Sequence, residues 1–401
     1  MARCGSYQND DVKKMIPYAR QNITKNDIKS VVKVLKSDFL TQGPIIGRFE
    51  KAFASYVGSK YSVAVSNGTA ALHLSALALG VHSGTRVITT PISFVASSNC
   101  VLYCGGEIKF IDINPDNYLL DIKKLEDFLK NKPKGYIKGL IVVDFAGYPA
   151  NMESFHKLAL KYNFWIIEDA CHAPGGYFID SRGVRQKCGN GKFSDLSVFS
   201  FHPVKHITAG EGGMITTNRR DLYKKILSLR NHGITKDAEK MVQSHGGWYY
   251  EMQELGFNYR LTDIQAALGV SQLKQAKNNL KKRKDIVRRY NEAFKKIKNA
   301  DLLCPNIDSG FGHAYHLYII QTDKRKELYE YLKIKGINCQ VHYIPIHLQP
   351  YYKKFGYKKG DFPVAEKYYE KCLSLPLFPS LKKKEQDYVI KSVEDFYEKQ
   401  R

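Results

Sequence analysis

The chain contains 401 residues, of which 43% are hydrophobic and 25% are charged, and such values are ordinary for a globular protein. This length exceeds what one hydrophobic core usually supports, so we expect a large domain and a smaller one. No stretch approaches the roughly 20 consecutive apolar residues of a membrane-spanning helix, and the opening residues MARCGSYQNDDVKKM contain no apolar signal core. We therefore expect a cytoplasmic protein with no membrane partner.

The formal net charge is +23, and a field of this sign concentrates polyanions near a protein surface. The basic residues are spread through helical runs such as 277–290, and the sequence has no zinc finger, RNA-binding sheet signature or basic zipper. We therefore favour a lysine-rich solvated surface over nucleic-acid recognition. The same positive field would attract a substrate that carries a diphosphate.

The eight cysteines are scattered, without a Cys-x-x-Cys pair or a zinc-binding spacing. We interpret them as reduced thiols and predict no metal site; they are Cys4, Cys100, Cys104, Cys171, Cys188, Cys304, Cys339 and Cys372.

Residues 18–57 begin with an amphipathic helical pattern that a glycine- and proline-marked loop follows. Short apolar runs then alternate with helical stretches that begin at Ala70, near Phe94 and near Ile122. Parallel strands need crossover connections, so this alternation predicts a mostly parallel sheet between helices, with ligands at the carboxyl ends of its strands. The seven runs are 61–66, 86–90, 106–113, 139–144, 164–169, 196–200 and 213–217.

A long helical pattern from Thr262 to about Ile297 leads the chain out of this sheet. The remainder has strand and helix signals of its own, in HLYIIQT (316–322), NCQVHYI (338–344) and EDFYEKQ (394–400). We predict a large α/β domain over residues 1–275 and a smaller α+β domain over residues 276–401.

Ser66-Asn67-Gly68-Thr69 follows the first strand of the predicted sheet. The first N–H groups of the next helix are unsatisfied there, and a glycine lets a phosphate approach closely. An ordinary helix cap would explain the same residues.

The fifth strand ends in Glu168-Asp169-Ala170-Cys171-His172. Asp169 could be a helix cap and His172 a polar core residue. As a pair they fit pyridoxal 5′-phosphate (PLP), since an acid that keeps a pyridine nitrogen protonated and a flat ring nearby are what this cofactor requires.

Lys205 follows the strand that ends at Ser200, and the glycines of Gly210-Glu211-Gly212-Gly213 come shortly after it. A lysine at the end of a buried strand has a depressed pKa and can act as a nucleophile, although most lysines are simply solvated. The convergence of Asp169, Ser200 and Lys205 at strand ends beside a phosphate-competent helix start favours the catalytic interpretation.

These motifs resemble the sugar-nucleotide aminotransferases of the DegT/StrS family, which are fold-type I PLP enzymes. The resemblance runs over nearly the whole chain; it includes DFLTQGP (38–44), SNGTAALHL (66–74), TTPISFVASSN (89–99), EDACHA (168–173), FSFHPVKHITAGEGG (199–213), RNHGI (230–234), GFNYRLTDIQAALG (256–269) and VHYIPIH (341–347). Some relatives have histidine at the position of Lys205 and are dehydratases, whereas this chain keeps the lysine.

The resemblance implies a role for each matching residue. Lys205 would bind PLP covalently and move the proton in catalysis, and Asp169 would hold the pyridine nitrogen. The ring would contact His172 and Phe94, and its phosphate would contact Gly68, Thr69 and Ser200. The resemblance also implies a homodimer with shared active sites, in which Asn258 reaches the phosphate of the partner subunit's cofactor.

For the substrate, the family-like positions are Thr41, Gln42 and Gly43 in one loop and His342 and Tyr343 in another. The first segment could be merely a turn and the second a strand end. Arg230 and Arg260 could bind a carboxylate or diphosphate through their forked donors, or could pair with a carboxylate in the helical layer.

The reaction implied is transfer of an amino group from L-glutamate to a nucleotide-linked keto sugar. SFHPVK and TTPISFVA are most similar to the members that act in pseudaminic acid synthesis, at C4 of UDP-2-acetamido-2,6-dideoxy-β-L-arabino-hexos-4-ulose. Another keto sugar, of the perosamine, viosamine or bacillosamine type, stays an alternative. A second alternative is a non-catalytic basic binding protein on the same fold.

Overall fold

The computed structural model describes residues 15–295, 297 and 310–398. Its largest element is the predicted seven-stranded sheet, whose strand order is β1-β9-β8-β5-β4-β2-β3. All seven apolar runs form these strands: β1 (Tyr61–Val65), β2 (Arg86–Thr89), β3 (Glu107–Phe110), β4 (Gly139–Val143), β5 (Trp165–Asp169), β8 (Leu196–Ser200) and β9 (Gly213–Thr217). In this sheet β9 runs antiparallel to both of its neighbours, and the other neighbouring pairs are parallel. The predicted α/β class with a mostly parallel sheet is confirmed.

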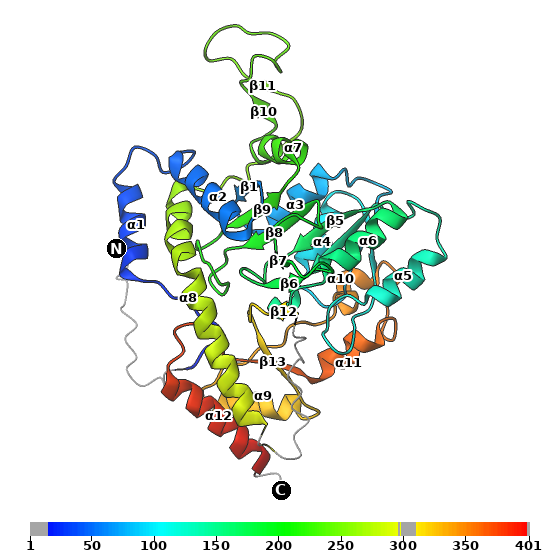
Figure 1. Cartoon of the computed structure of the whole chain (residues 1–401), viewed down its shortest axis with the longest axis vertical. Coiled ribbons are helices and arrows are strands. Elements are labelled where there is room, and N and C mark those ends of the chain that lie inside the picture. The colour runs from blue at the N-terminus through cyan, green and yellow to red at the C-terminus, as the bar shows by residue number, and fades with distance from the viewer. Residues whose placement is uncertain (1–14, 296, 298–309, 399–401) are drawn as a thin grey trace, which may run out of the picture.

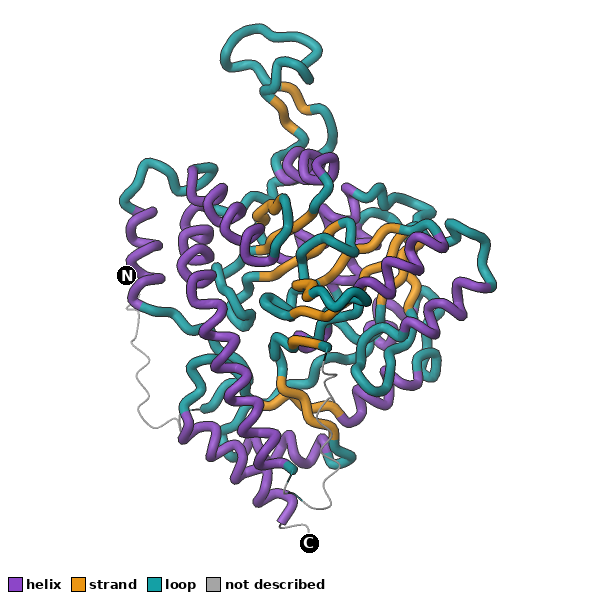
Figure 2. Tube along the Cα trace, in the orientation of Figure 1, coloured by secondary structure: helices purple, strands orange, loops and turns teal. Residues whose placement is uncertain are grey.

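Helices cover both faces of the sheet (Figures 1 and 2). Along β4, Leu140 and Val142 pack into one buried cluster and Ile141 packs into another on the opposite face. Both faces are therefore apolar, which explains why the strands appear as continuous apolar runs in the sequence. The surrounding helices are α1 (Lys25–Leu35), α2 (Pro44–Val57), α3 (Gly68–Ala78), α4 (Ala96–Tyr103), α5 (Ile122–Lys130), α6 (Met152–Tyr162) and α7 (Arg220–Arg230), with the short 3₁₀ turn η1 (Phe145–Gly147).

Helix α8 (Asp263–Phe294) links this body to a second hydrophobic core (Figure 1). Its first half packs with α2, whereas Ile286, Val287 and Tyr290 belong to a cluster with β13 and α12. The predicted boundary after residue 275 falls inside α8, and the division into two domains stays a prediction. The C-terminal elements are β13 (Tyr318–Gln321), α9 (Arg325–Ile334), η2 (Ile346–Leu348), α10 (Pro350–Lys353), α11 (Pro363–Lys371), β14 (Cys372–Leu375) and α12 (Lys383–Glu398).

The structure differs from the predicted pattern in the segment NCQVHYI. Instead of a strand it is an extended loop that makes an isolated bridge between Gln340 and Ser374. Ile346 and Tyr352, which follow it, pack into a cluster of the seven-stranded sheet. The loop thus returns the chain to the large sheet, which places His342 and Tyr343 near the ends of its strands.

β13 pairs with β14 in a two-stranded antiparallel sheet, and two further small sheets complete the fold. β6 (Tyr177–Ile179), β7 (Arg185–Lys187) and β12 (Phe311–Gly312) form one of them, and β10 (Ile234–Thr235) pairs with β11 (Glu251–Met252) in the other. The β10–β11 hairpin projects away from the body at the top of Figure 1.

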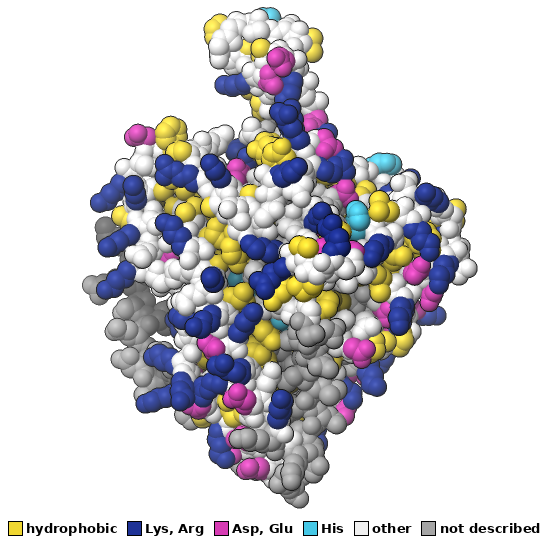
Figure 3. All heavy atoms as spheres, viewed as in Figure 1, with side chains coloured by type: hydrophobic (Ala, Val, Ile, Leu, Met, Phe, Trp, Pro, Cys, Tyr) yellow, Lys and Arg dark blue, Asp and Glu magenta, His cyan; other side chains and the backbone are white. Residues whose placement is uncertain are grey.

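On the face drawn in Figure 3, lysine and arginine side chains are scattered among other residues and do not gather in one patch. Six cysteines are free thiols, and Cys4 and Cys304 lie outside the described residues. Among the helices that the structure describes, none combines the length and the apolar character that crossing a bilayer requires.

Candidate active site

A cavity of about 710 Å³ opens at the carboxyl ends of the strands. Such an edge is where open α/β sheets bind ligands. Nine of the residues predicted from the sequence line this cavity: Gly68, Thr69, Phe94, Asp169, His172, Ser200, Lys205, His342 and Tyr343. These nine residues lie up to 275 positions apart in the sequence.

Lys205 lies in the connection that returns the chain from β8 to β9. Its backbone N–H donates to the carbonyl of His202 at 2.9 Å, and Ala209 N–H closes the loop onto the carbonyl of Phe201 at 2.9 Å. Burial lowers the pKa of Lys205, and the nearby Cys171 and Asp169 oppose that shift. A lysine amine held in this way is more readily deprotonated, and hence more nucleophilic, than a solvated one.

Asp169 is the last residue of β5, and its carboxylate reaches the base of the cavity. Its Oδ2 accepts a hydrogen bond from the Ser97 hydroxyl at 2.7 Å, and its Oδ1 accepts one from Cys171 N–H at 3.3 Å. These two bonds fix the orientation of the carboxylate. Asp169 is therefore arranged to accept a further hydrogen bond from a cationic ring.

Aromatic rings form one wall of the cavity. His172 is buried, and the Tyr343 hydroxyl lies 3.3 Å from its Nε2. Phe94 is 56% exposed, with its ring centre 6.3 Å from that of Tyr343. Burial, reinforced by the positive charge of Lys205, lowers the pKa of His172 well below its usual range, so the imidazole is neutral and can serve as a flat packing surface.

The second histidine of this wall, His342, is also neutral. Burial, followed by the charge of Lys205, lowers its pKa to about 3. Its Nδ1 lies 2.8 Å from the Ser374 hydroxyl.

The start of α3 forms the other end of the cavity. Asn67 caps the helix by accepting from Ala70 N–H at 2.8 Å, so the predicted cap is present. A Cβ at Gly68 would lie 3.0 Å from Ser200 Cβ, and a Cβ at Gly213 would lie 2.4 Å from the Asn67 carbonyl oxygen. These glycines bring the helix start and the end of β8 together, which leaves backbone N–H groups at a site suited to a phosphate.

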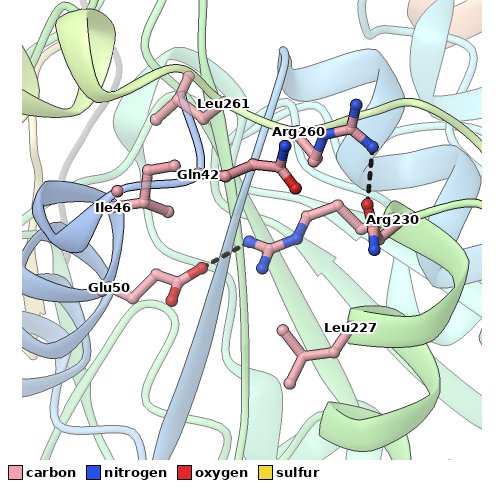
Figure 4. Close-up of a pocket in the computed structure, with 10 residues that line it drawn as sticks. Gln42, Ile46, Glu50, Leu227, Arg230, Arg260 and Leu261 are labelled. Atoms are coloured by element: carbon pink, nitrogen blue, oxygen red, sulfur yellow. Dashed lines mark hydrogen bonds and ion pairs between the residues drawn. The ribbon is translucent and has the colours of Figure 1, made fainter. Parts of the chain in front are cut away.

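Four residues predicted to bind substrate lie elsewhere, around a smaller cavity of about 310 Å³ (Figure 4). They are Gln42, Gly43, Arg230 and Arg260. Thr41 and Asn258 line neither cavity among the described residues. In a single chain the predicted substrate residues are thus divided between two places.

The residues of this smaller cavity have structural partners in their own chain. Arg230 pairs with Glu50 at 2.6 Å, and Arg260 donates to Asn231 Oδ1 at 2.7 Å. Asp263 accepts from Gly43 N–H at 2.7 Å, which fixes the segment 41–43 as a turn at the start of α8. The structural alternative noted for Arg230 is what the structure shows, and the substrate role of these residues stays a prediction.

Several residues of the large cavity were not predicted from the sequence, among them Tyr18, Ser93, Ser97, Tyr103 and Tyr259. Ser93 and Ser97 lie inside the motif 89–99, and their hydroxyls carried no signal of their own. Tyr18 precedes the sheet by a long stretch of chain, so no local pattern connects it with the cavity.

Comparison with known proteins identifies the family. The model of the DegT/DnrJ/EryC1/StrS aminotransferase family matches residues 21–394. The chain belongs to this family. The resemblance in the motifs is thereby confirmed, and with it the fold-type I architecture, the aminotransferase activity and the PLP cofactor.

The matches to individual relatives cover nearly the full length of both chains. A transaminase of Campylobacter jejuni subsp. jejuni serotype O:2, for UDP-4-amino-4,6-dideoxy-N-acetyl-beta-L-altrosamine, is 38% identical over 94% of this chain and 96% of its own. GDP-perosamine synthase of Escherichia coli O157:H7 is 32% identical over 96% and 99%. Spr1654 of Streptococcus pneumoniae, named for sugar aminotransfer and solved in a PLP form, has a TM-score of 0.85 at 28% identity, with coverage of 96% and 99%. The relatives support aminotransfer to a sugar and leave the particular sugar open.

The large cavity of this aminotransferase fits PLP on the chemistry of its own residues. It has an amine with a lowered pKa and a carboxylate that accepts hydrogen bonds. It also has a neutral imidazole whose buried Nδ1 finds no partner among the described residues. An amine, an acid and a ring surface are the groups that PLP uses.

Proposed function

We propose that this aminotransferase moves the amino group of L-glutamate to C4 of a nucleotide-linked 4-keto-6-deoxy sugar. The preferred substrate is UDP-2-acetamido-2,6-dideoxy-β-L-arabino-hexos-4-ulose, and the product is UDP-4-amino-4,6-dideoxy-N-acetyl-β-L-altrosamine. The observation that carries the proposal is that Lys205 and Asp169 line one cavity with a phosphate-competent helix start. The 38% identity to the Campylobacter transaminase supports the choice of sugar.

Lys205 is the residue that would bind PLP, and its amine would accept the proton from the donor carbon and deliver a proton to C4 of the sugar. Its lowered pKa leaves the amine less firmly protonated than a solvated lysine, so the amine is better able to accept a proton and return it in the second half of the reaction. When bound, PLP supplies an electron sink that no side chain offers.

The neighbouring residues are proposed to hold the reactants in place. Asp169 would keep the ring nitrogen protonated, and His172 with Tyr343 would restrict water and orient the ring. Gly68, Thr69 and Ser200 would hold the phosphate at the start of α3. Fixing amine, cofactor and sugar in one cavity supplies an orientation advantage that free reactants lack.

We further propose that the active unit is a homodimer. Asn258 does not line the cavity of its own chain, and the β10–β11 hairpin that precedes it projects from the body of the molecule (Figure 1). Trp248 is 75% exposed and Val242 is 90% exposed. Exposed apolar groups of this kind are typical of protein interfaces, so a second copy of the chain would bury them and bring Asn258 to the partner's cavity.

The substrate proposal is tested by incubating the purified protein with L-glutamate and a panel of nucleotide 4-keto sugars, with product identified by mass spectrometry and NMR. The expected result is the fastest amination for the 2-acetamido L-arabino-configured UDP sugar. Absence of turnover with this sugar would remove it as the substrate.

The second candidate is amination of a GDP-linked keto sugar of the perosamine type, which the likeness to GDP-perosamine synthase supports. Amination of that sugar in the same panel would favour it. A protein that binds no PLP, aminates none of the sugars and binds nucleic acid in a salt-dependent way would instead be the non-catalytic alternative.

A further inference from the structure

Two serine hydroxyls form a hydrogen-bonded chain that ends on Asp169. Ser97, the second residue of α4, donates to Asp169 Oδ2 at 2.7 Å, and the hydroxyls of Ser93 and Ser97 lie 2.7 Å apart. Ser93 is 4% exposed and Ser97 is 1% exposed. Side-chain oxygens buried to this degree retain their hydrogen bonds, because leaving one unmade is costly.

The direction of this chain follows from the protons available. A serine hydroxyl has a single proton, and Ser97 donates its proton to Asp169 Oδ2. The contact between the two serines must therefore have Ser93 as the donor and Ser97 as the acceptor. Hydrogen bonds aligned in one direction polarise one another, so Ser93 strengthens the bond that Ser97 makes.

We propose that Ser97, backed by Ser93, is a positioning residue that fixes the carboxylate of Asp169 toward the pyridine nitrogen of PLP. The proposal rests on the role proposed above for Asp169. The bond to Oδ2 limits rotation of the carboxylate and stabilises its negative charge. Without it, the carboxylate would be free to rotate away from the ring nitrogen, and it would hold the ring and its proton less firmly.

The neighbouring Ser98 provides a matched control. It lies on the same helix and is fully buried, but its hydroxyl contacts the carbonyl of Val95 at 3.0 Å and the Tyr352 hydroxyl at 2.6 Å. Ser98 does not line the cavity. Loss of this hydroxyl thus removes a buried hydrogen bond of α4 without touching Asp169.

The experiment compares Ser97→Ala, Ser93→Ala and Ser98→Ala in the full-length protein. The dissociation constant for PLP is measured by equilibrium dialysis of the cofactor-depleted forms. Ser97→Ala is expected to raise it about tenfold, the lower end for a lost hydrogen bond to a charged group. Ser93→Ala is expected to raise it about two- to threefold because it acts through Ser97, and Ser98→Ala is expected to leave it within about twofold of wild type.

The second readout is the ¹⁵N resonance of ring-labelled PLP bound to each form, which a merely structural role would not move. In Ser97→Ala the resonance is expected to shift toward the value of the unprotonated ring, and in Ser98→Ala it stays unchanged. Thermal unfolding of the cofactor-depleted forms checks their folding. If Ser97→Ala does not fold, Ser97→Cys, which keeps the size and a weak donor, is expected to give an intermediate dissociation constant.

Two outcomes separate this inference from the proposed function. If Asp169→Ala binds PLP as wild type does, the proposed role of Asp169 is wrong, and the positioning role of the serines fails with it. If Asp169→Ala loses PLP but Ser97→Ala matches Ser98→Ala in both readouts, the positioning role alone is overturned.

Discussion

Arg230 and Glu50 form an ion pair of 2.6 Å that joins the end of α7 to α2. The same guanidinium group donates to the Ala64 carbonyl at 2.7 Å, and Glu50 accepts from Ala64 N–H at 2.9 Å. Both side chains are mostly buried, with exposures of 16% and 15%. Two helices and the edge strand β1 are thus held together by one charged pair beside the smaller cavity (Figure 4).

This pair predicts a stability defect for Arg230→Ala. Removing one partner leaves the other charge buried, so we expect a loss of about 2–4 kcal/mol in the free energy of unfolding. A double-mutant cycle with Glu50→Ala should give a coupling of about 1–2 kcal/mol in urea unfolding. Arg219 pairs with Asp221 and Asp195 and is itself half exposed, so Arg219→Ala is the solvent-screened control, with an expected loss below about 1 kcal/mol.

If Arg230 instead binds the substrate, Arg230→Ala should affect activity and not stability. Unchanged stability with a raised KM for the sugar nucleotide would return Arg230 to the substrate role predicted from the sequence.

The strands of the large sheet were predictable because helices cover both of its faces. Their residues are apolar on both sides, so each strand appears as a short continuous apolar run. A parallel sheet also collects the carboxyl ends of its strands at one edge. This geometry brings Asp169, Ser200 and Lys205 into one cavity, as the sequence predicted.

Other features depend on contacts between distant segments and were not predictable. The partner of Arg230 is a glutamate 180 positions away. No local pattern shows whether this arginine meets a carboxylate of its own chain or an anion of the substrate. The segment around His342 has the composition of a strand, yet it forms a loop because Ile346 and Tyr352 pack back onto the large sheet. Ser97 is one of many serines, and only its 2.7 Å contact with Asp169 distinguishes it.

Lys205→Ala is expected to abolish both the covalent link to PLP and transamination. No other amine among the described cavity residues can replace it, so the rate should fall about 10³-fold or more. Borohydride reduction followed by peptide mass spectrometry should locate PLP on the Lys205 peptide of wild type and on no peptide of the variant. Lys192→Ala, at a surface loop outside the cavity, is the control and should keep wild-type turnover. Near-normal turnover in Lys205→Ala would refute the assigned role.

Complementation between inactive variants tests whether Asn258 serves the partner subunit. Asn258→Ala and Lys205→Ala are each expected to be inactive alone. In a mixed dimer, one site would combine an intact Lys205 with an intact Asn258 from the other chain. Random reassociation of equal amounts should therefore restore about a quarter of wild-type activity. If Asn258 served its own chain's site, mixing would restore nothing.

Asp144 and Glu168 form a buried acidic pair behind the active site. Their carboxylates and the Cys188 thiol all lie within 4.8 Å of one another, and Asp144 Oδ2 has no partner among the described residues. Burial, with the charge of Glu168 as a second cause, raises the pKa of Asp144 well above its usual range. Burial also raises the pKa of Glu168 to about 6. A proton on Asp144 that is donated to Glu168 would satisfy both groups.

Asp144→Asn should therefore flatten the dependence of stability on pH. Both folded-state pKa values are raised, so the folded protein holds more protons than the unfolded chain between about pH 4 and the folded values. The stability from this pair is complete below about pH 4 and is lost as pH rises through that window. Asparagine keeps an N–H donor at every pH. The stability of the variant to urea, relative to that of wild type, should therefore increase from pH 5 to pH 8.

Asp180 is the control with the opposite sign. Backbone hydrogen bonds, led by the one from Val184, lower its pKa, so its contribution is present above the unfolded pKa and is lost as pH falls through the folded value. Asp180→Asn should thus be less stable to urea than wild type at pH 7, and the difference in stability should shrink as the pH falls. Parallel curves for wild type and Asp144→Asn would mean that Asp144 does not carry the proton.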